Sequence, residues 1–205
     1  MNPARKVKKF RENGVKERIL SPDEMRRLIN AANRAIRPVL VMALNTGMRR
    51  NEILSLRWKN VDLVSGYIFI EDSKSGRSRK APINGQVFEA LSGLKQDGEY
   101  VFPNAETGTY IKDVKTAFRG ACERAEIKGL RFHDLRHTAL SVMVEAGIDI
   151  VTVSKIAGHA SIQMTMRYAH PPPENMRLTV EKLGEIFQKV ETKSRLSRSS
   201  GPKLL

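Results

Sequence analysis

The sequence predicts an α+β protein that is mainly α-helical and carries a small three-stranded antiparallel sheet. Residues 21–24 read Ser-Pro-Asp-Glu, which combines a capping serine, a proline suited to the first helical position and the glutamate of a capping box. Between residues 61 and 83 the apolar residues alternate as in strands, and from Gln86 onward they mostly follow helical spacing. We expect one domain over residues 19–190 of the 205-residue chain.

The two ends of the chain differ from this domain in composition. Residues 1–18 carry seven basic and two acidic side chains and few apolar ones, which favours a basic arm or an interdomain linker. Residues 191–205 are polar and low in large apolar side chains, so we expect a disordered tail there.

Helices are expected on both sides of the sheet. After the first helix, residues 38–46 form an apolar segment that Gly47 should stop, and residues 49–58 resume helical spacing. Beyond the sheet, the spacing predicts helices at about 86–95, 110–126, 134–146, 149–157, 161–168 and 174–190.

The sheet is expected from three short apolar runs. Val61–Val64 and Tyr67–Ile70 read as strands joined by Ser65-Gly66. A polar, glycine-containing turn at residues 73–78 then leads into a third strand that ends near Ile83.

The charge balance favours a polyanionic partner. Lys and Arg number 36 and Asp and Glu 22, which gives a net charge of +14. Neutralising phosphates releases condensed counterions, so this surplus favours nucleic acid. The single cysteine, Cys122, excludes an intrachain disulfide and fits a reducing compartment. Without a run of ~18 apolar residues or a secretory signal, we expect a cytoplasmic protein with no membrane partner.

The segment at residues 131–138, RFHDLRHT, concentrates side chains that could do chemistry. His133, Arg136 and His137 are three and four residues apart on a predicted helix and can share one face. The His-Asp-x-x-His spacing resembles a zinc-binding motif, although a third ligand would have to be His159 or His170, and Arg136 would repel a dication. A helix-start histidine beside a surface arginine is the ordinary structural alternative.

Three further pieces are each weak when taken alone. Arg49 follows Gly47 at a predicted helix start, where backbone N–H groups also favour an anion. Lys74 lies among other cations in the predicted turn, and a solvated basic turn is the common alternative. Tyr168, nine residues after His159, would by default be a half-buried packing residue.

Taken together and in this order, these pieces resemble the tyrosine recombinase (phage integrase) family. The matching motifs are TGMR at 46–49, SKSGRSRKAPI at 73–83, HDLRHT at 133–138, GH at 158–159 and YAH at 168–170. The resemblance covers roughly residues 19–190 and implies the catalytic-domain fold of this family. Ala157 and Met164 depart from residues common in the family, but neither carries chemistry.

The resemblance implies that the protein is an enzyme that transfers DNA strands. Tyr168 would attack a phosphodiester, displace a 5′-hydroxyl and form a 3′-phosphotyrosyl link. Arg49 and Arg136 would clamp the non-bridging phosphate oxygens, and His159 would donate a further hydrogen bond to them. Rigid guanidinium groups suit this task better than lysines, because they match the geometry of the phosphate oxygens.

The resemblance assigns the implied proton transfers to Lys74, which would protonate the leaving 5′-oxygen, and His133, which would assist the tyrosine. A tyrosine with a pKa near ~10 needs such a base or nearby cations. Two arginines and a histidine can replace a divalent metal, so no cofactor or metal is expected. The covalent link conserves the energy of the broken bond, in line with the absence of an ATP-binding P-loop pattern.

Double-stranded DNA is the implied partner, and the family implies a homo-oligomer, a tetramer on DNA, for a full-length protein. Members usually carry a helical domain before the catalytic one, which the stretch at 1–18 is too short to form. We therefore expect an excised catalytic domain in preference to a naturally minimal member of the family. Such a domain should show weak or no self-association. Residues 174–190, after three prolines, resemble the family's segment that docks on a neighbouring subunit.

Two alternatives keep the fold and change the task. A type IB topoisomerase-like enzyme would relax supercoils by the same phosphotyrosine step. A catalytically silent DNA-binding protein would lack one of the six implied active-site residues, and all six are present. The DNA target sequence, and the choice among integration, excision, dimer resolution and transposition, are not encoded in these motifs.

Overall fold

The computed structural model describes residues 18–71, 78–169, 177 and 180–185. These belong to two compact units, Met1–Tyr168 and Ala169–Leu205, which are described separately. Several expectations lie outside the described residues: almost all of the basic arm, Lys74 with most of its turn, His170, the three prolines and the tail at 191–205.

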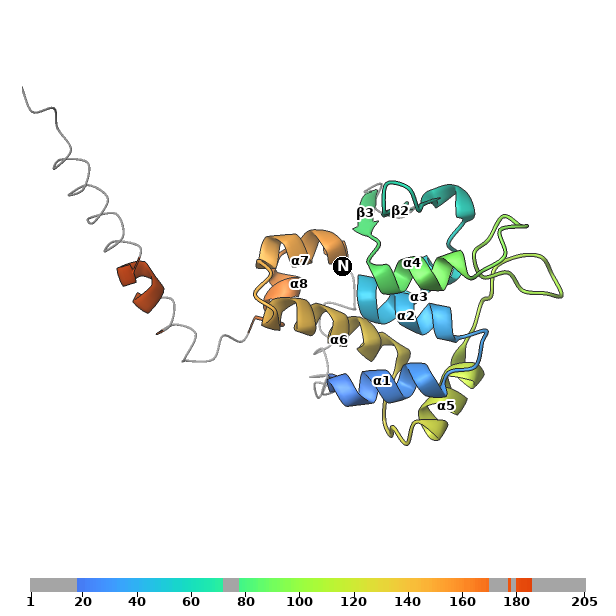
Figure 1. The fold of residues 1–205 in the computed structure, drawn as a ribbon, viewed down its shortest axis with the longest axis horizontal. Helices are drawn as coiled ribbons and strands as arrows, with labels where there is room; N and C mark the ends of the chain where they lie inside the picture. The colour runs from blue at the N-terminus through green and yellow to red at the C-terminus, as the bar shows by residue number, and fades with distance from the viewer. Residues whose placement is uncertain (1–17, 72–77, 170–176, 178–179, 186–205) are drawn as a thin grey trace, which may run out of the picture. The chain divides into compact units, whose positions relative to one another are not determined.

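The first unit is mainly α-helical with one small antiparallel sheet, which confirms the predicted fold class (Figure 1). Its helices are α1 (Pro22–Ala31), α2 (Arg37–Thr46), α3 (Arg50–Leu54), the 3₁₀ turn η2 (Trp58–Asn60), α4 (Gly85–Ser92), α5 (Lys115–Arg124), α6 (Phe132–Glu145), α7 (Ile150–Ala157) and α8 (Gln163–Met166). The strands β1 (Val61–Asp62), β2 (Tyr67–Ile70) and β3 (Arg79–Pro82) pair in the order β1-β2-β3.

Two of the predicted helix signals are confirmed in detail. The Ser21 hydroxyl accepts from the backbone N–H of Glu24 at 3.2 Å, and the Glu24 carboxylate accepts from the backbone N–H of Ser21 at 3.0 Å. Gly47 ends α2 in the left-handed conformation, with φ of 63°. A Cβ at Gly47 would lie 3.1 Å from a methyl group of Leu140, so this position also favours close packing of the chain against α6.

The predicted helix over residues 49–58 is wrong beyond Leu54, because the following backbone pairs with a distant segment. The carbonyl of Leu56 accepts from the N–H of Val101 at 2.9 Å, and the N–H of Trp58 donates to the carbonyl of Glu99 at 3.0 Å. Tertiary pairing with residues 99–101 thus replaces the helical hydrogen bonds that local spacing favours.

Three further boundaries differ from the prediction. The helix predicted over 110–126 begins only at Lys115, since Ile111 donates to the carbonyl of Phe102 at 3.0 Å. The strand predicted to reach Val64 ends at Asp62, whose carboxylate accepts from the N–H groups of the two residues in the turn, Val64 and Ser65. The helix predicted over 161–168 is only the short α8.

Helix α6 connects the two hydrophobic clusters of the first unit. It packs against α2 and α7, while α2 also packs against α4, and α1 against α5 (Figure 1). The main core includes Leu40, Met42, Ile53 and Leu135. A separate small cluster joins Leu140 on α6 to Val153 and Ala157 on α7 and to Tyr168. The tyrosine therefore packs against the second half of α6.

In the second unit, residues 177 and 180–185 are helical, and Arg177 forms an ion pair with Glu181 at 3.1 Å. The remainder of the helix predicted at 174–190 lies outside the described residues. Across the part of the chain that the structure describes, every helix is too short or too polar to cross a membrane.

Candidate active site

Two arginines from different helices converge on the end of α7. Arg49, the residue before α3, donates from Nη2 to the carbonyl of Gly158 at 2.9 Å. Arg136, on the first half of α6, donates to the carbonyls of Gly47 at 2.7 Å and Ala157 at 2.8 Å. Because Ala157, the last residue of α7, and Gly158, the residue after it, are consecutive acceptors, the two guanidinium groups are fixed next to each other.

Arg136 keeps its charge although it is buried, with only 4% of its surface exposed. Burial and the neighbouring charge of Arg49 lower the pKa of Arg136 to about 10, which still leaves the guanidinium protonated at neutral pH. Two adjacent cations in a poorly solvated place form a strong binding site for an anion with several oxygens.

A carboxylate and a third arginine support this pair. The Glu52 carboxylate accepts from Arg49 at 2.9 Å and from both terminal nitrogens of Arg79 at 3.0 and 2.6 Å. Arg79 also donates from Nε to the carbonyl of Ile156 at 3.0 Å. Burial raises the pKa of Glu52, but the hydrogen bonds from Arg79 and Arg49 outweigh it and hold this pKa below its usual value.

Glu52 is not among the six active-site residues that the sequence motifs imply, and neither is Arg79. Strand alternation contained a signal for it. Arg79 lies two residues before the fully buried Ala81, so it shares the inward face of β3, where a charged side chain needs a partner.

His159 lies beside the arginine pair as a neutral imidazole. Its Nδ1 is 2.8 Å from the hydroxyl of Thr165, a fully buried residue on α8 that was also not identified from the sequence. Burial, followed by the charges of Arg136 and Arg49, lowers the pKa of His159 to about 4. At neutral pH one ring nitrogen therefore carries a proton that it can donate and the other accepts.

This low pKa gives a prediction for stability against pH. The unfolded chain protonates His159 near its ordinary pKa of 6.5, well above the value of about 4 in the folded protein. Its contribution to the free energy of unfolding is therefore complete above pH 6.5 and is lost as the pH falls towards 4. Urea unfolding should show that the free energy of unfolding falls less between pH 7 and pH 5 in His159→Gln than in the wild type. An equal loss in both proteins would contradict the prediction.

Tyr168 is buried next to two histidines. Only 8% of its surface is exposed, and its hydroxyl lies 2.6 Å from Nδ1 of His137. Its ring is nearly parallel to that of His159, with 6.4 Å between the ring centroids. Burial raises the pKa of Tyr168, against an opposing effect of Arg167 and Arg136, so the phenol stays protonated at neutral pH.

His133 lies next to His137. Its ring meets that of His137 edge to face, with 4.6 Å between centroids, and burial lowers its pKa. The Tyr168 hydroxyl contacts His137, which the sequence suggested only as a metal ligand. The structure therefore brings together Arg49, Arg136, His159 and Tyr168, with His133 adjacent through His137.

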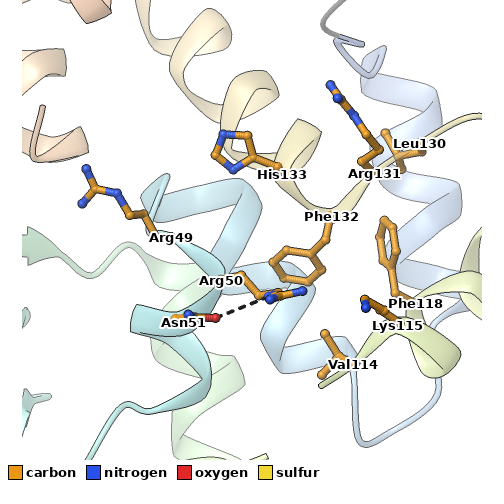
Figure 2. Close-up of a pocket in the computed structure, with 10 residues that line it drawn as sticks. All are labelled: Arg49, Arg50, Asn51, Val114, Lys115, Phe118, Leu130, Arg131, Phe132 and His133. Atoms are coloured by element: carbon orange, nitrogen blue, oxygen red, sulfur yellow. Dashed lines mark hydrogen bonds between the residues drawn. The ribbon is translucent and has the colours of Figure 1, made fainter. Parts of the chain in front are cut away.

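A pocket of about 610 Å³ opens beside Arg49 and His133 (Figure 2). Figure 2 shows further basic side chains around it, Arg50, Lys115 and Arg131. Phe118 and Phe132 form an apolar side of this pocket, edge to face with 5.4 Å between centroids. The combination of cations and aromatic rings next to the arginine pair suits a nucleic acid strand.

The zinc alternative raised by the HDLRH segment requires three converging ligands. Within residues 18–71, 78–169, 177 and 180–185, no three His, Cys, Asp or Glu side chains gather in a way that could hold a metal ion. Asp134 instead accepts from the backbone and side chain of Arg131, at 2.8 and 2.7 Å, where it caps the start of α6.

Comparisons with known proteins place the chain in a family. The profile of the phage integrase family matches residues 18–175. The integrase of Salmonella phage P22 is 34% identical over 187 residues, covering 83% of this chain and 48% of that protein. The shufflon-specific DNA recombinase of Escherichia coli is 34% identical over 175 residues, covering 82% of this chain and 44% of that protein.

Solved structures share the fold. The catalytic domain of bacteriophage HP1 integrase superposes with a TM-score of 0.62 at 30% identity, covering 80% of this chain and 93% of that one. A crystal structure of XerA recombinase gives a TM-score of 0.67 at 26% identity, covering 80% of this chain and 63% of that one. The chain spans about half the length of the P22 and shufflon relatives.

Proposed function

Because the chain belongs to the phage integrase family, we propose that it is the catalytic domain of a site-specific DNA recombinase, which cuts and rejoins strands through a 3′-phosphotyrosyl intermediate. The observation that carries this proposal is the placement of Tyr168 against His159 and within the field of the buried Arg136. A nucleophile and a phosphate clamp are thus in one site.

In this proposal the scissile phosphate lies between Arg49, Arg136 and His159. The arginines bind its two non-bridging oxygens. His159 accepts the Thr165 hydroxyl at Nδ1 and donates from Nε2 to the phosphate. Negative charge grows on these oxygens in the five-coordinate transition state, so each fixed donor contributes on the order of 3 kcal/mol to its stabilisation. The cations thus supply the charge stabilisation that a divalent metal supplies in other nucleases.

The strand is cut when the Tyr168 oxygen forms a bond to phosphorus and the bond to the 5′-oxygen breaks. The phenol proton leaves with assistance from His133, and Lys74 gives a proton to the departing 5′-oxygen. Attack by a 5′-hydroxyl reverses these steps and joins the strands without ATP, because the phosphotyrosyl link retains the energy of the original bond.

Double-stranded DNA is the proposed substrate and partner. The Tn1549 transposon integrase has been solved in complex with circular intermediate DNA, and the XerH site-specific recombinase has been solved bound to a difH substrate; both are similar to this chain in fold. In this chain Arg50 and Lys115, beside the Arg49 pocket, are placed to contact phosphates next to the scissile one. A full-length protein of this kind would assemble as a tetramer on DNA and act in the cytoplasm of a bacterial, phage or mobile-element host.

The test is covalent trapping on a pool of duplexes that carry a nick within a randomised sequence. Cleavage next to the nick releases a short fragment that diffuses away, so the phosphotyrosyl adduct accumulates. We expect an adduct that resists denaturant and is lost in Tyr168→Phe, and sequencing the trapped DNA gives the target site. An adduct that persists in Tyr168→Phe would show that the nucleophile is misassigned.

The same experiment separates recombinase from topoisomerase activity. A recombinase should enrich a defined sequence in the trapped DNA. Trapping without sequence enrichment, together with relaxation of a plasmid of arbitrary sequence, would favour the topoisomerase-like alternative.

A further inference from the structure

We infer that His137 is a positioning residue for the nucleophile: its Nδ1 accepts the hydrogen bond of the Tyr168 hydroxyl and fixes the direction of the phenol oxygen. This inference rests on the proposed function of Tyr168. It gives a role to the second histidine of the HDLRHT motif, for which the proposed mechanism has no use.

The contact is short and enclosed. The His137 Nδ1 and the Tyr168 oxygen are 2.6 Å apart, and the two residues are only 6% and 8% exposed. Their ring centroids are 5.8 Å apart and the rings are tilted by 40°. A hydrogen bond of this length between buried groups restricts the hydroxyl more than a solvated one would.

The protonation states set the direction of this hydrogen bond. Burial lowers the pKa of His137, and the charges of Arg131 and Arg136 act in the same direction, against an opposing effect of Asp134. The imidazole is therefore neutral at neutral pH. Burial raises the pKa of Tyr168, so the phenol retains its proton. The phenol O–H then donates to Nδ1, and the proton of the imidazole is on Nε2.

His137 can act as a reference point because the helix around it is fixed from several sides. The preceding residue, Arg136, donates to carbonyls at the ends of α2 and α7. The following residue, Thr138, accepts from the backbone N–H of Leu20 at 3.1 Å and donates to the carbonyl of Asp134 at 2.8 Å. Tyr168, in contrast, comes just after the four-residue α8 and is the last residue of the first unit.

The consequence concerns the attacking atom. A phenol whose O–H donates a hydrogen bond to Nδ1 keeps its oxygen lone pairs available for phosphorus, with Arg136 and His159 nearby. Loss of the acceptor would let the hydroxyl rotate and the ring shift in its pocket. A displacement of about 1 Å at a reacting atom lowers a rate by about 100-fold. The expected effect is therefore on the rate of cleavage and not on DNA affinity.

The test compares His137→Asn with His137→Leu in the full chain. The Asn side chain places an oxygen one bond beyond Cγ, where His has Nδ1, whereas Leu has no acceptor there. On the target duplex identified by covalent trapping, we expect His137→Leu to lower the single-turnover cleavage rate about 10- to 100-fold, with an unchanged Kd for DNA. The cleavage rate of His137→Asn should stay within about fivefold of the wild-type rate. Equal cleavage rates in the wild type and His137→Leu would overturn the inference, and so would equal losses of rate in His137→Leu and His137→Asn.

A second measurement needs no DNA and does not depend on activity. In protein labelled with ¹³C at tyrosine Cζ, the Tyr168 resonance is identified by its loss in Tyr168→Phe. We expect it to shift in His137→Gln, whose polar atoms lie one bond too far out, and to remain near its wild-type position in His137→Asn. An unchanged Tyr168 resonance in His137→Gln would overturn the inferred hydrogen bond. A normal shift pattern in a protein that never forms a DNA adduct would instead show that the proposed function is wrong.

Discussion

Replacing Arg136 by lysine is expected to lower the single-turnover rate of DNA cleavage by about 10²- to 10³-fold, with a much smaller change in DNA affinity. Lysine preserves the positive charge but presents a single nitrogen. It cannot donate to the carbonyls of Gly47 and Ala157 and at the same time hold a phosphate oxygen. The oxygens of the transition state would therefore lose a fixed donor, while bulk attraction to DNA remains.

The matched control is Arg119→Lys, on the exposed face of α5. The Arg119 side chain is 74% exposed and its ion pair with Glu123 is long, at 3.8 Å. This variant should cleave at the wild-type rate. If Arg136→Lys also cleaved at the wild-type rate, the buried guanidinium would not be part of the phosphate clamp, and a weaker anion site elsewhere would have to be considered.

The parts of the fold that were predicted correctly depend on short-range chemistry. The capping box at Ser21, the left-handed Gly47 and the strand Tyr67–Ile70 are each determined by neighbouring residues, and all three match the structure. The failures arise where distant backbone segments pair. Leu56 exchanges a helical hydrogen bond for one with Val101, a partner that spacing alone does not reveal.

The candidate site divides along a similar line. Side chains proposed to touch the phosphate, such as Arg49 and Arg136, are part of short motifs and could be selected from the sequence. The contacts that hold them could not be predicted. Strand alternation marks Arg79 as inward-facing but does not show that it reaches Glu52 on another element, and spacing does not show that Thr165 meets His159 from the following turn. Such supporting contacts are defined by tertiary packing. They are also where the largest effect on stability is expected.

Replacing Glu52 by alanine is expected to lower the free energy of unfolding by about 3–5 kcal/mol, towards the lower end of this range because Arg49 is partly solvated. The substitution leaves the guanidinium of Arg79, whose side chain is 11% exposed, without its carboxylate. The control is Glu123→Ala, which removes one member of a pair that is more than 70% exposed on both sides and should change stability by less than about 1 kcal/mol. Urea unfolding of both variants measures the difference.

A double-mutant cycle then distinguishes a lost interaction from a poorly tolerated substitution. If Glu52 and Arg79 stabilise each other, Glu52→Ala combined with Arg79→Ala should be less destabilising than the sum of the single variants, by about 1–3 kcal/mol. Strict additivity would mean that the two side chains act independently despite their 2.6 Å contact. Coupling is the expected result, because removing both partners leaves no buried charge unpaired. The double variant should nevertheless cleave DNA slowly, since Arg49 has lost the carboxylate that orients it at 2.9 Å.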